Sequence, residues 1–127
     1  MIAALSGWHE RHDDAARALD AVTALPAHVL LEAYAVLTRL PAGLAVPASA
    51  AAGVLARRFD TPPLGLDDAQ RRSVLTRLAD AGVAGGSAYD GLVALEASAH
   101  DQVLLTLDDR AHATYRRLGV SFEPITP

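Results

Sequence analysis

The stretch from Ser87 to Ile125 places the strongest limit on the fold of this 127-residue chain. It reads SAYDGLVALEASAHDQVLLTLDDRAHATYRRLGVSFEPI, and its apolar spacing predicts a helix, a strand, a second helix and a second strand. The segments expected are a helix from Ser87 to about His100, the strand Val103 to Thr106, a helix from Asp109 to Leu118, and the strand Val120 to Phe122. Two short strands joined by a helix favour a parallel sheet in a layered α/β domain.

The rest of the chain continues the same alternation, without a repeat or a linker, so we expect one domain over residues 1–127. Its fold class is α/β, with three α/β/α layers around a short, mostly parallel sheet. The further segments expected are a short helix ending over Ile2 to Leu5, a helix from Asp13 or Asp14 to about Val22, a strand over Ala24 to Val29, a helix over Leu30 to Leu40, a helix over Ala48 to Phe59, a strand over Leu64 to Leu66, and a helix opened by an Asp67–Gln70 capping box.

Composition excludes several kinds of chemistry. The chain has no cysteine, which removes disulfides and thiolate zinc sites, and all eleven basic residues are arginine, which removes mechanisms that require a lysine. The Gly-x-Ser-x-Gly motif of serine hydrolases is absent as well. A net charge of −4 does not suggest a broad nucleic-acid-binding surface. Since no apolar run reaches the length of a membrane span, we expect a cytosolic protein without a membrane role.

Three acidic residues are candidates for a shared site at the carboxyl edge of the sheet: Glu32, Asp90 and Asp108. Each is predicted in a first helical turn, and converging carboxylates need a cation, for which oxygen ligands favour Mg²⁺ or Mn²⁺. Each also has a purely structural explanation. Asp90 is three residues after Ser87, as in a capping box, Asp108 fits an N-cap, and Glu32 fits a solvated surface.

His9 and His12 have a spacing that metal ligands can adopt, but no third ligand lies near them in the sequence, so this pair is weak evidence for a metal site.

The segments HVLLEAYAVL, SAYDGLVALEASAH, VLLTLDDR and LGVSFEPI together resemble the PIN domain, and specifically a VapC-type toxin of a bacterial toxin–antitoxin pair. The most specific part is the Tyr-Asp-x-Leu-x-Ala helix followed by Leu-Leu-Thr-Leu-Asp. The resemblance implies that Glu32, Asp90 and Asp108 are acidic metal-binding and catalytic positions. It also implies that Thr106 helps to orient the site, whereas Asp109 has no clear counterpart.

The same resemblance implies a Mg²⁺- or Mn²⁺-dependent ribonuclease that cleaves structured RNA, such as tRNA or ribosomal RNA. A VapB-type antitoxin is expected to cover the site, and a homodimer is the usual assembly of the family. A basic segment of the antitoxin would complement a chain of charge −4.

One feature departs from the family pattern. Family members begin with a strand that ends in an aspartate, whereas the chain as printed begins with residues that fit the helix after that strand, and Asp13 and Asp14 lie too far along to replace the aspartate. We therefore expect weak metal binding and little nuclease activity. Two alternatives stay open: a catalytically impaired PIN-like module that sequesters an antitoxin or RNA, and an unrelated α/β domain whose three acids do not converge.

Overall fold

The computed structural model describes residues 2–4, 22–106 and 108–125. Its elements are β1 (Ile2–Ala4), α2 (Ala27–Thr38), α3 (Ala48–Arg58), α4 (Asp68–Asp80), α5 (Ser87–Ser98), β2 (Leu104–Thr106), the 3₁₀ helix η1 (Asp109–Ala111), α6 (His112–Arg117) and β3 (Phe122–Pro124). The three strands form a parallel sheet in the order β1-β2-β3, in which Leu104 pairs with Ile2 on one side and with Phe122 on the other.

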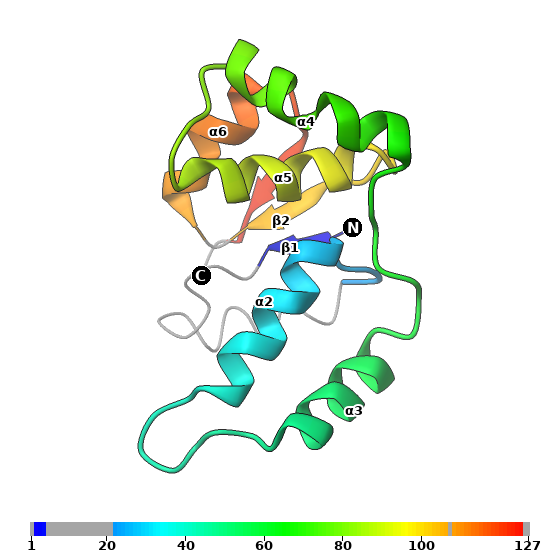
Figure 1. Ribbon diagram of the computed structural model, residues 1–127, viewed down its shortest axis with the longest axis vertical. Helices are drawn as coiled ribbons and strands as arrows, with labels where there is room; N and C mark the ends of the chain where they lie inside the picture. The colour runs from blue at the N-terminus through cyan, green and yellow to red at the C-terminus, as the bar shows by residue number, and fades with distance from the viewer. Residues whose placement is uncertain (1, 5–21, 107, 126–127) are drawn as a thin grey trace.

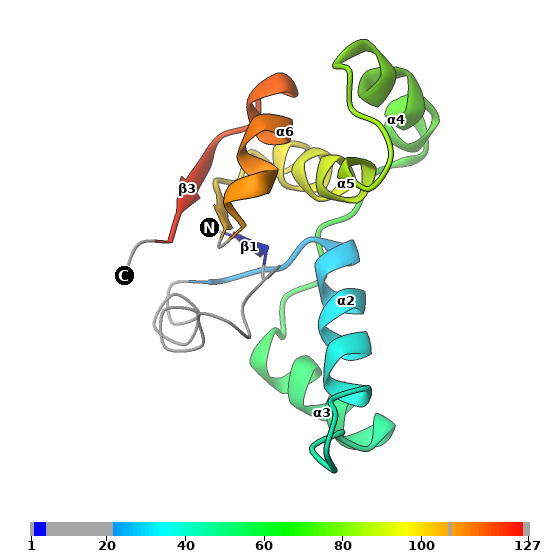
Figure 2. The same cartoon turned by 90° about the vertical axis from the view of Figure 1, so that its left-hand side faces the viewer.

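Helices lie on both sides of this sheet, which confirms the predicted α/β/α layering. Figure 1 shows α4, α5 and α6 above the strands and α2 with α3 below them in this view. Figure 2 shows α2 and α3 as a hairpin that extends away from the sheet. Helix α5 is the central element, since it contacts α2, α4 and α6.

The core forms where the sequence is apolar on every face. All of β2 is buried, as expected for a central strand of a parallel sheet. Helix α5 is buried at Gly91 and from Val93 to Ala97, so it is covered nearly all round. The main core cluster is formed by buried side chains from α2, α5, β2 and α6 and their flanking loops: Val22, Leu25, Val29, Val93, Ala94, Ala97, Leu104, Leu105, Ala111, Tyr115 and Val120.

The start of the chain differs from the prediction. We expected Ile2 to Leu5 to end a short helix and the first strand of the family to be missing, but Ile2–Ala4 form β1 and pair with β2. A strand at this position satisfies backbone groups along one edge of β2, whereas a helix of one turn is too short to be stable. The helix expected there is therefore wrong over Ile2–Ala4. The sequence of β1 is Ile-Ala-Ala and contains no acid, and the absence of the family's aspartate-bearing first strand stays a prediction.

The segment before α2 is also corrected. The predicted strand over Ala24 to Val29 reduces to bridge residues at Ala24 and Pro26. Pro26 pairs with Leu64, and the predicted strand at Leu64 to Leu66 is only the other half of that bridge. Helix α2 begins three residues earlier than expected because Pro26, at φ −57°, suits the position before a first helical turn. As a consequence, Glu32 lies in the second turn of α2 and not in the first.

The remaining elements follow the prediction more closely. Helix α3 begins directly after Pro47, and α4 begins with the expected capping box between Asp67 and Gln70. The helix expected from Asp109 to Leu118 divides into η1 and α6, and the last strand lies two residues later than expected.

Two predictions concern residues outside the described part of the chain: the His9 and His12 pair, and nearly all of the helix expected to end near Val22. No helix in the described part of the chain is long and apolar enough to cross a membrane.

Candidate acidic site beside strand β2

Asp90 lies in the first turn of α5. The residue before this helix, Gly86, makes no side-chain cap, and Ser87 is already the first helical residue, so the capping-box explanation of Asp90 does not apply. Burial raises the pKa of Asp90 most, and the negative charges of Asp108 and Glu32 raise it further. The positive charges of Arg110 and His28 act in the opposite direction. The charges of Asp108 and Glu32 thus both act on Asp90.

Asp108 lies between β2 and η1, at the carboxyl edge of the sheet. Its Oδ1 accepts a hydrogen bond from the backbone N–H of Arg110 at 3.0 Å and lies 3.4 Å from Nε of the same arginine. Asp108 is therefore the N-cap of η1, as its structural explanation predicted. Its own backbone N–H donates to Oγ1 of Thr106 at 3.1 Å, and Thr106 is fully buried. Thr106 consequently fixes the direction in which the chain leaves β2.

Glu32 lies on α2, which contacts α5, and about half of its side chain is exposed. Its Oε1 lies 2.8 Å from Nε2 of His28, one helical turn earlier. The backbone N–H of His28 donates to Oε1 of Glu96, on α5, at 3.1 Å. A chain of contacts from Glu32 through His28 to Glu96 therefore joins the helix that carries Glu32 to the helix that carries Asp90.

Tyr115 of α6 is fully buried in the main core cluster. Burial raises the pKa of its phenol far above the usual range, and the negative charges of Asp90, Asp108 and Glu32 raise it further, while a hydrogen bond with the Thr106 side chain opposes them. One buried phenol thus experiences the charges of all three candidate acids. Tyr115 keeps its proton at neutral pH, so it adds no fourth negative charge to the site.

Sequence reasoning missed Glu96, His28 and the effect of the three acids on Tyr115. Glu96 is only 5% exposed, and its pKa is raised by burial, against the hydrogen bond from the His28 N–H and the charges of His28 and His100. The available signal was a carboxylate within the otherwise apolar α5, because a buried charge requires a partner. No sequence signal assigned that partner to the first turn of α2.

A divalent cation fits the chemistry of the three acids, which offer only oxygen atoms and repel one another. In the residues that the structure describes, however, no three His, Asp or Glu side chains are grouped so that they could hold a metal ion. A hollow of about 190 Å³, lined in part by Asp101, Val103 and Ser121, lies beside the opposite end of β2 and does not belong to the acidic group.

The comparison with known proteins gives two kinds of match. Residues 1–117 match the model of the PIN domain family. The chain is 40% identical to ribonuclease VapC40 of Mycobacterium tuberculosis, in strains CDC 1551 and H37Rv, over 99% of this chain and 94% of the relative. It is 43% identical to ribonuclease VapC27 of strain H37Rv, over 76% of this chain and 70% of the relative. No solved structure matches at comparable significance.

Proposed function

Because this chain belongs to the PIN domain family, we propose that it is an endoribonuclease that hydrolyses phosphodiester bonds in RNA. Both relatives described above carry the name ribonuclease. The observation that supports the proposal most directly is electrostatic: the charges of Glu32, Asp90 and Asp108 all bear on Tyr115. These three carboxylates come from three separate segments of the chain, and their negative charges act on the same buried phenol. A purely structural role would not need that arrangement.

We propose Glu32, Asp90 and Asp108 as the catalytic residues that hold Mg²⁺ or Mn²⁺. When bound, such an ion supplies a polarised phosphate oxygen and a water of lowered pKa. The neighbouring residues hold the acids in place. Thr106 fixes the backbone of Asp108, and His28 holds Glu32 through the 2.8 Å contact between Nε2 and Oε1.

We further propose that a VapB-type antitoxin and a second copy of this chain are the protein partners, and that the RNA belongs to the tRNA or ribosomal class. A basic antitoxin segment would complement the acidic site in a chain of charge −4. Leu31 and Val54 are exposed on the α2–α3 hairpin, which is compatible with a covering partner there.

The second candidate function is a PIN-like binding module that sequesters an antitoxin or RNA without cleavage. Two observations favour it: β1 carries no acid, and the described residues contain no group of three metal-ligating side chains. It differs from the ribonuclease in what it predicts for cations, since a module without catalysis has no need to bind them.

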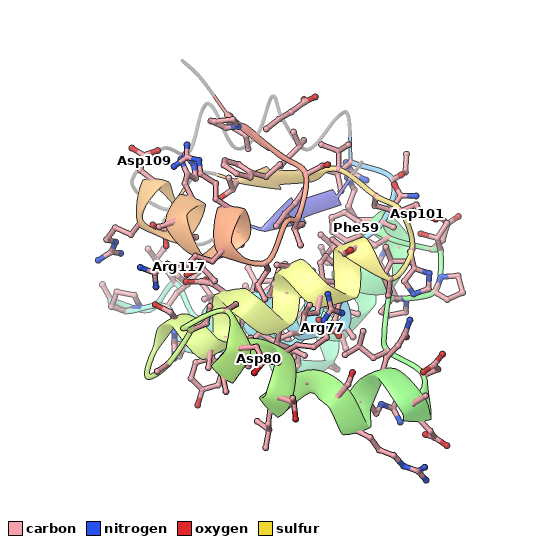
Figure 3. The ribbon with its side chains drawn as sticks, turned by 90° about the horizontal axis from the view of Figure 1, so that it is seen from above. Phe59, Arg77, Asp80, Asp101, Asp109 and Arg117 are labelled. Atoms are coloured by element: carbon pink, nitrogen blue, oxygen red, sulfur yellow. The ribbon has the colours of Figure 1, made fainter. Side chains whose placement is uncertain are left out.

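The test combines RNA cleavage with calorimetric titration of Mg²⁺ and Mn²⁺ into the purified chain. Cleavage of purified tRNA or ribosomal RNA should depend on the ion, stop with EDTA and fall at least about 100-fold in Asp90→Asn. The matched control is Asp80→Asn, because Asp80 is an exposed acid at the end of α4, away from β2 (Figure 3). RNA binding without cleavage or heat of metal binding would support the binding module instead.

A further inference from the structure

Tyr89 lies directly beside the acidic site and projects largely into solvent. It is the third residue of α5, next to Asp90, and 62% of it is exposed. Its ring stacks on the ring of His28, with centroids 5.6 Å apart and an angle of 17° between the planes. An exposed aromatic residue on its own needs no explanation, but this ring is held by a second ring that itself contacts a candidate catalytic acid.

The support beneath Tyr89 is fixed from two directions. The backbone N–H of His28 donates to the buried carboxylate of Glu96, and its Nε2 lies 2.8 Å from Glu32. Both contacts restrain His28, and the ring of Tyr89 stacks on its imidazole. A flat, preoriented ring is the kind of surface on which a nucleobase stacks.

The charge of the chain makes such a contact valuable. Proteins gain most of their affinity for nucleic acid from cations placed against phosphates, but this chain has a net charge of −4 and an acidic site. Arg110 is the cation that acts on Asp90 from the β2 side, and it already contacts Asp108. Base stacking needs no positive charge, so it can contribute affinity here without neutralising the acids.

We propose that the stacked Tyr89 and His28 rings form a subsite for one unpaired nucleobase next to the scissile bond. The inference rests on the proposed ribonuclease function and specifies its substrate further. A base inside a duplex already has both faces stacked, so this subsite admits a base from a loop, a bulge or a strand end. The scissile bond therefore lies beside an unpaired nucleotide.

The experiment uses the full chain and an RNA hairpin whose loop contains the cleavage site found with the wild-type protein. Tyr89→Leu keeps an exposed apolar side chain without an aromatic face, and Tyr89→Phe restores the face. We expect Tyr89→Leu to raise KM about 10- to 100-fold with little change in kcat, and Tyr89→Phe to behave as wild type. Leu75→Ala, on the outer surface of α4, is the control for loss of an exposed apolar side chain.

A second arm replaces single loop nucleotides with abasic ones. At one position beside the scissile bond, removing the base should weaken binding of the RNA to the wild-type protein as much as Tyr89→Leu weakens binding of the intact RNA. When Tyr89→Leu is combined with the abasic RNA, the loss of affinity should be no larger than for either change alone. Binding to Asp90→Asn, measured by fluorescence anisotropy, gives the same comparison without cleavage.

The outcomes separate the two proposals. An unchanged KM in Tyr89→Leu, or losses that add at every position, overturns the stacking subsite and leaves the ribonuclease intact. Absence of both cleavage and RNA binding in the wild-type chain overturns both. Circular dichroism of Tyr89→Leu shows that the variant is folded, and rescue by Tyr89→Phe excludes a general defect.

Discussion

Glu96 provides the sharpest test of how α2 and α5 are held together. Helix α2 has no side-chain cap of its own, because Pro26 occupies the N-cap position. The Glu96 carboxylate supplies one from α5 by accepting a hydrogen bond from the His28 N–H at 3.1 Å. The two variants to compare are Glu96→Ala, which removes the acceptor, and Glu96→Gln, which keeps an acceptor oxygen of nearly the same shape without the charge.

The magnitude follows from two opposing effects. Glu96→Ala removes a hydrogen bond to a charged group, which contributes about 1.5–3 kcal/mol, and leaves a buried N–H without an acceptor. It also relieves the cost of burying a charge at a position that is 5% exposed. We therefore expect Glu96→Ala to lower the free energy of unfolding by about 2 kcal/mol at pH 7. Glu96→Gln should be at least as stable as wild type at that pH.

The pH dependence has a definite sign. Because burial raises the pKa of Glu96 in the folded state, the folded protein holds this proton more tightly than the unfolded chain does. The stability gained from the protonated carboxyl is present in full below the unfolded value, near 4.3, and is lost as the pH rises through the folded pKa. The advantage of Glu96→Gln over wild type should therefore be larger at pH 7 than at pH 4.

Urea unfolding followed by circular dichroism at pH 4, 5.5 and 7 measures both effects in the three proteins. The reasoning is refuted if Glu96→Gln is as unstable as Glu96→Ala at pH 7, because the charge would then be required for the contact. It is refuted equally by an advantage of Glu96→Gln that shrinks as the pH rises.

Three further substitutions test other contacts. Asp90→Asn should unfold in EDTA at a higher temperature than wild type at pH 7, with a difference that shrinks toward pH 4, because burial and like charges raise the pKa of Asp90; a lower melting temperature at pH 7 would contradict this. Gly91→Ala should lower the free energy of unfolding by about 1 kcal/mol, because the new Cβ would lie 2.5 Å from Cδ2 of Leu78 and this overpacking should outweigh the gain in helix propensity. Thermal unfolding should find no such loss when the same substitution is made in a Leu78→Val background. Thr106→Val removes the acceptor for the Asp108 N–H, so it should lower the free energy of unfolding by about 1 kcal/mol and the cleavage rate about 10-fold or more. Thr106→Ser keeps the hydroxyl and should retain both stability and cleavage. Equal effects of the two variants would argue against an orienting hydroxyl.

The part of the fold that the sequence predicted best is the part with the strongest local signals. The apolar run in β2 predicted a strand that is buried at the centre of a parallel sheet. The sequence of α5, which is apolar on nearly every face, predicted in the same way a helix that is covered on most sides. The capping box at Asp67 marked the start of α4 in the same way, because both of its hydrogen bonds are local.

The errors occurred where a neighbour far along the chain decides the structure. Residues 2–4 are too few to specify a helix or a strand, and their pairing with β2 decides the outcome. Leu64 pairs with Pro26 across 38 positions, a contact that local sequence patterns do not contain. The role of Glu96 depends on the distance between α2 and α5, which local periodicity does not contain.

The candidate site stays a prediction, in which Glu32, Asp90 and Asp108 were identified by residue type and order. Their relation to Tyr115 could not be predicted, because an inward-facing tyrosine on a helix is normally only a core residue.

The buried phenol of Tyr115 makes the acidic site visible to ultraviolet absorbance. Its raised pKa keeps it un-ionised in the folded protein at pH values where an ordinary phenol, with a pKa near 10, loses its proton. In an alkaline titration, the tyrosinate absorbance of this residue should therefore develop together with the loss of the circular dichroism signal. Tyr115→Phe removes that component, and the protein would then lose one of the forces that drive it to unfold in base. The phenol consequently links the charge of a surface site to the alkaline limit of the whole domain.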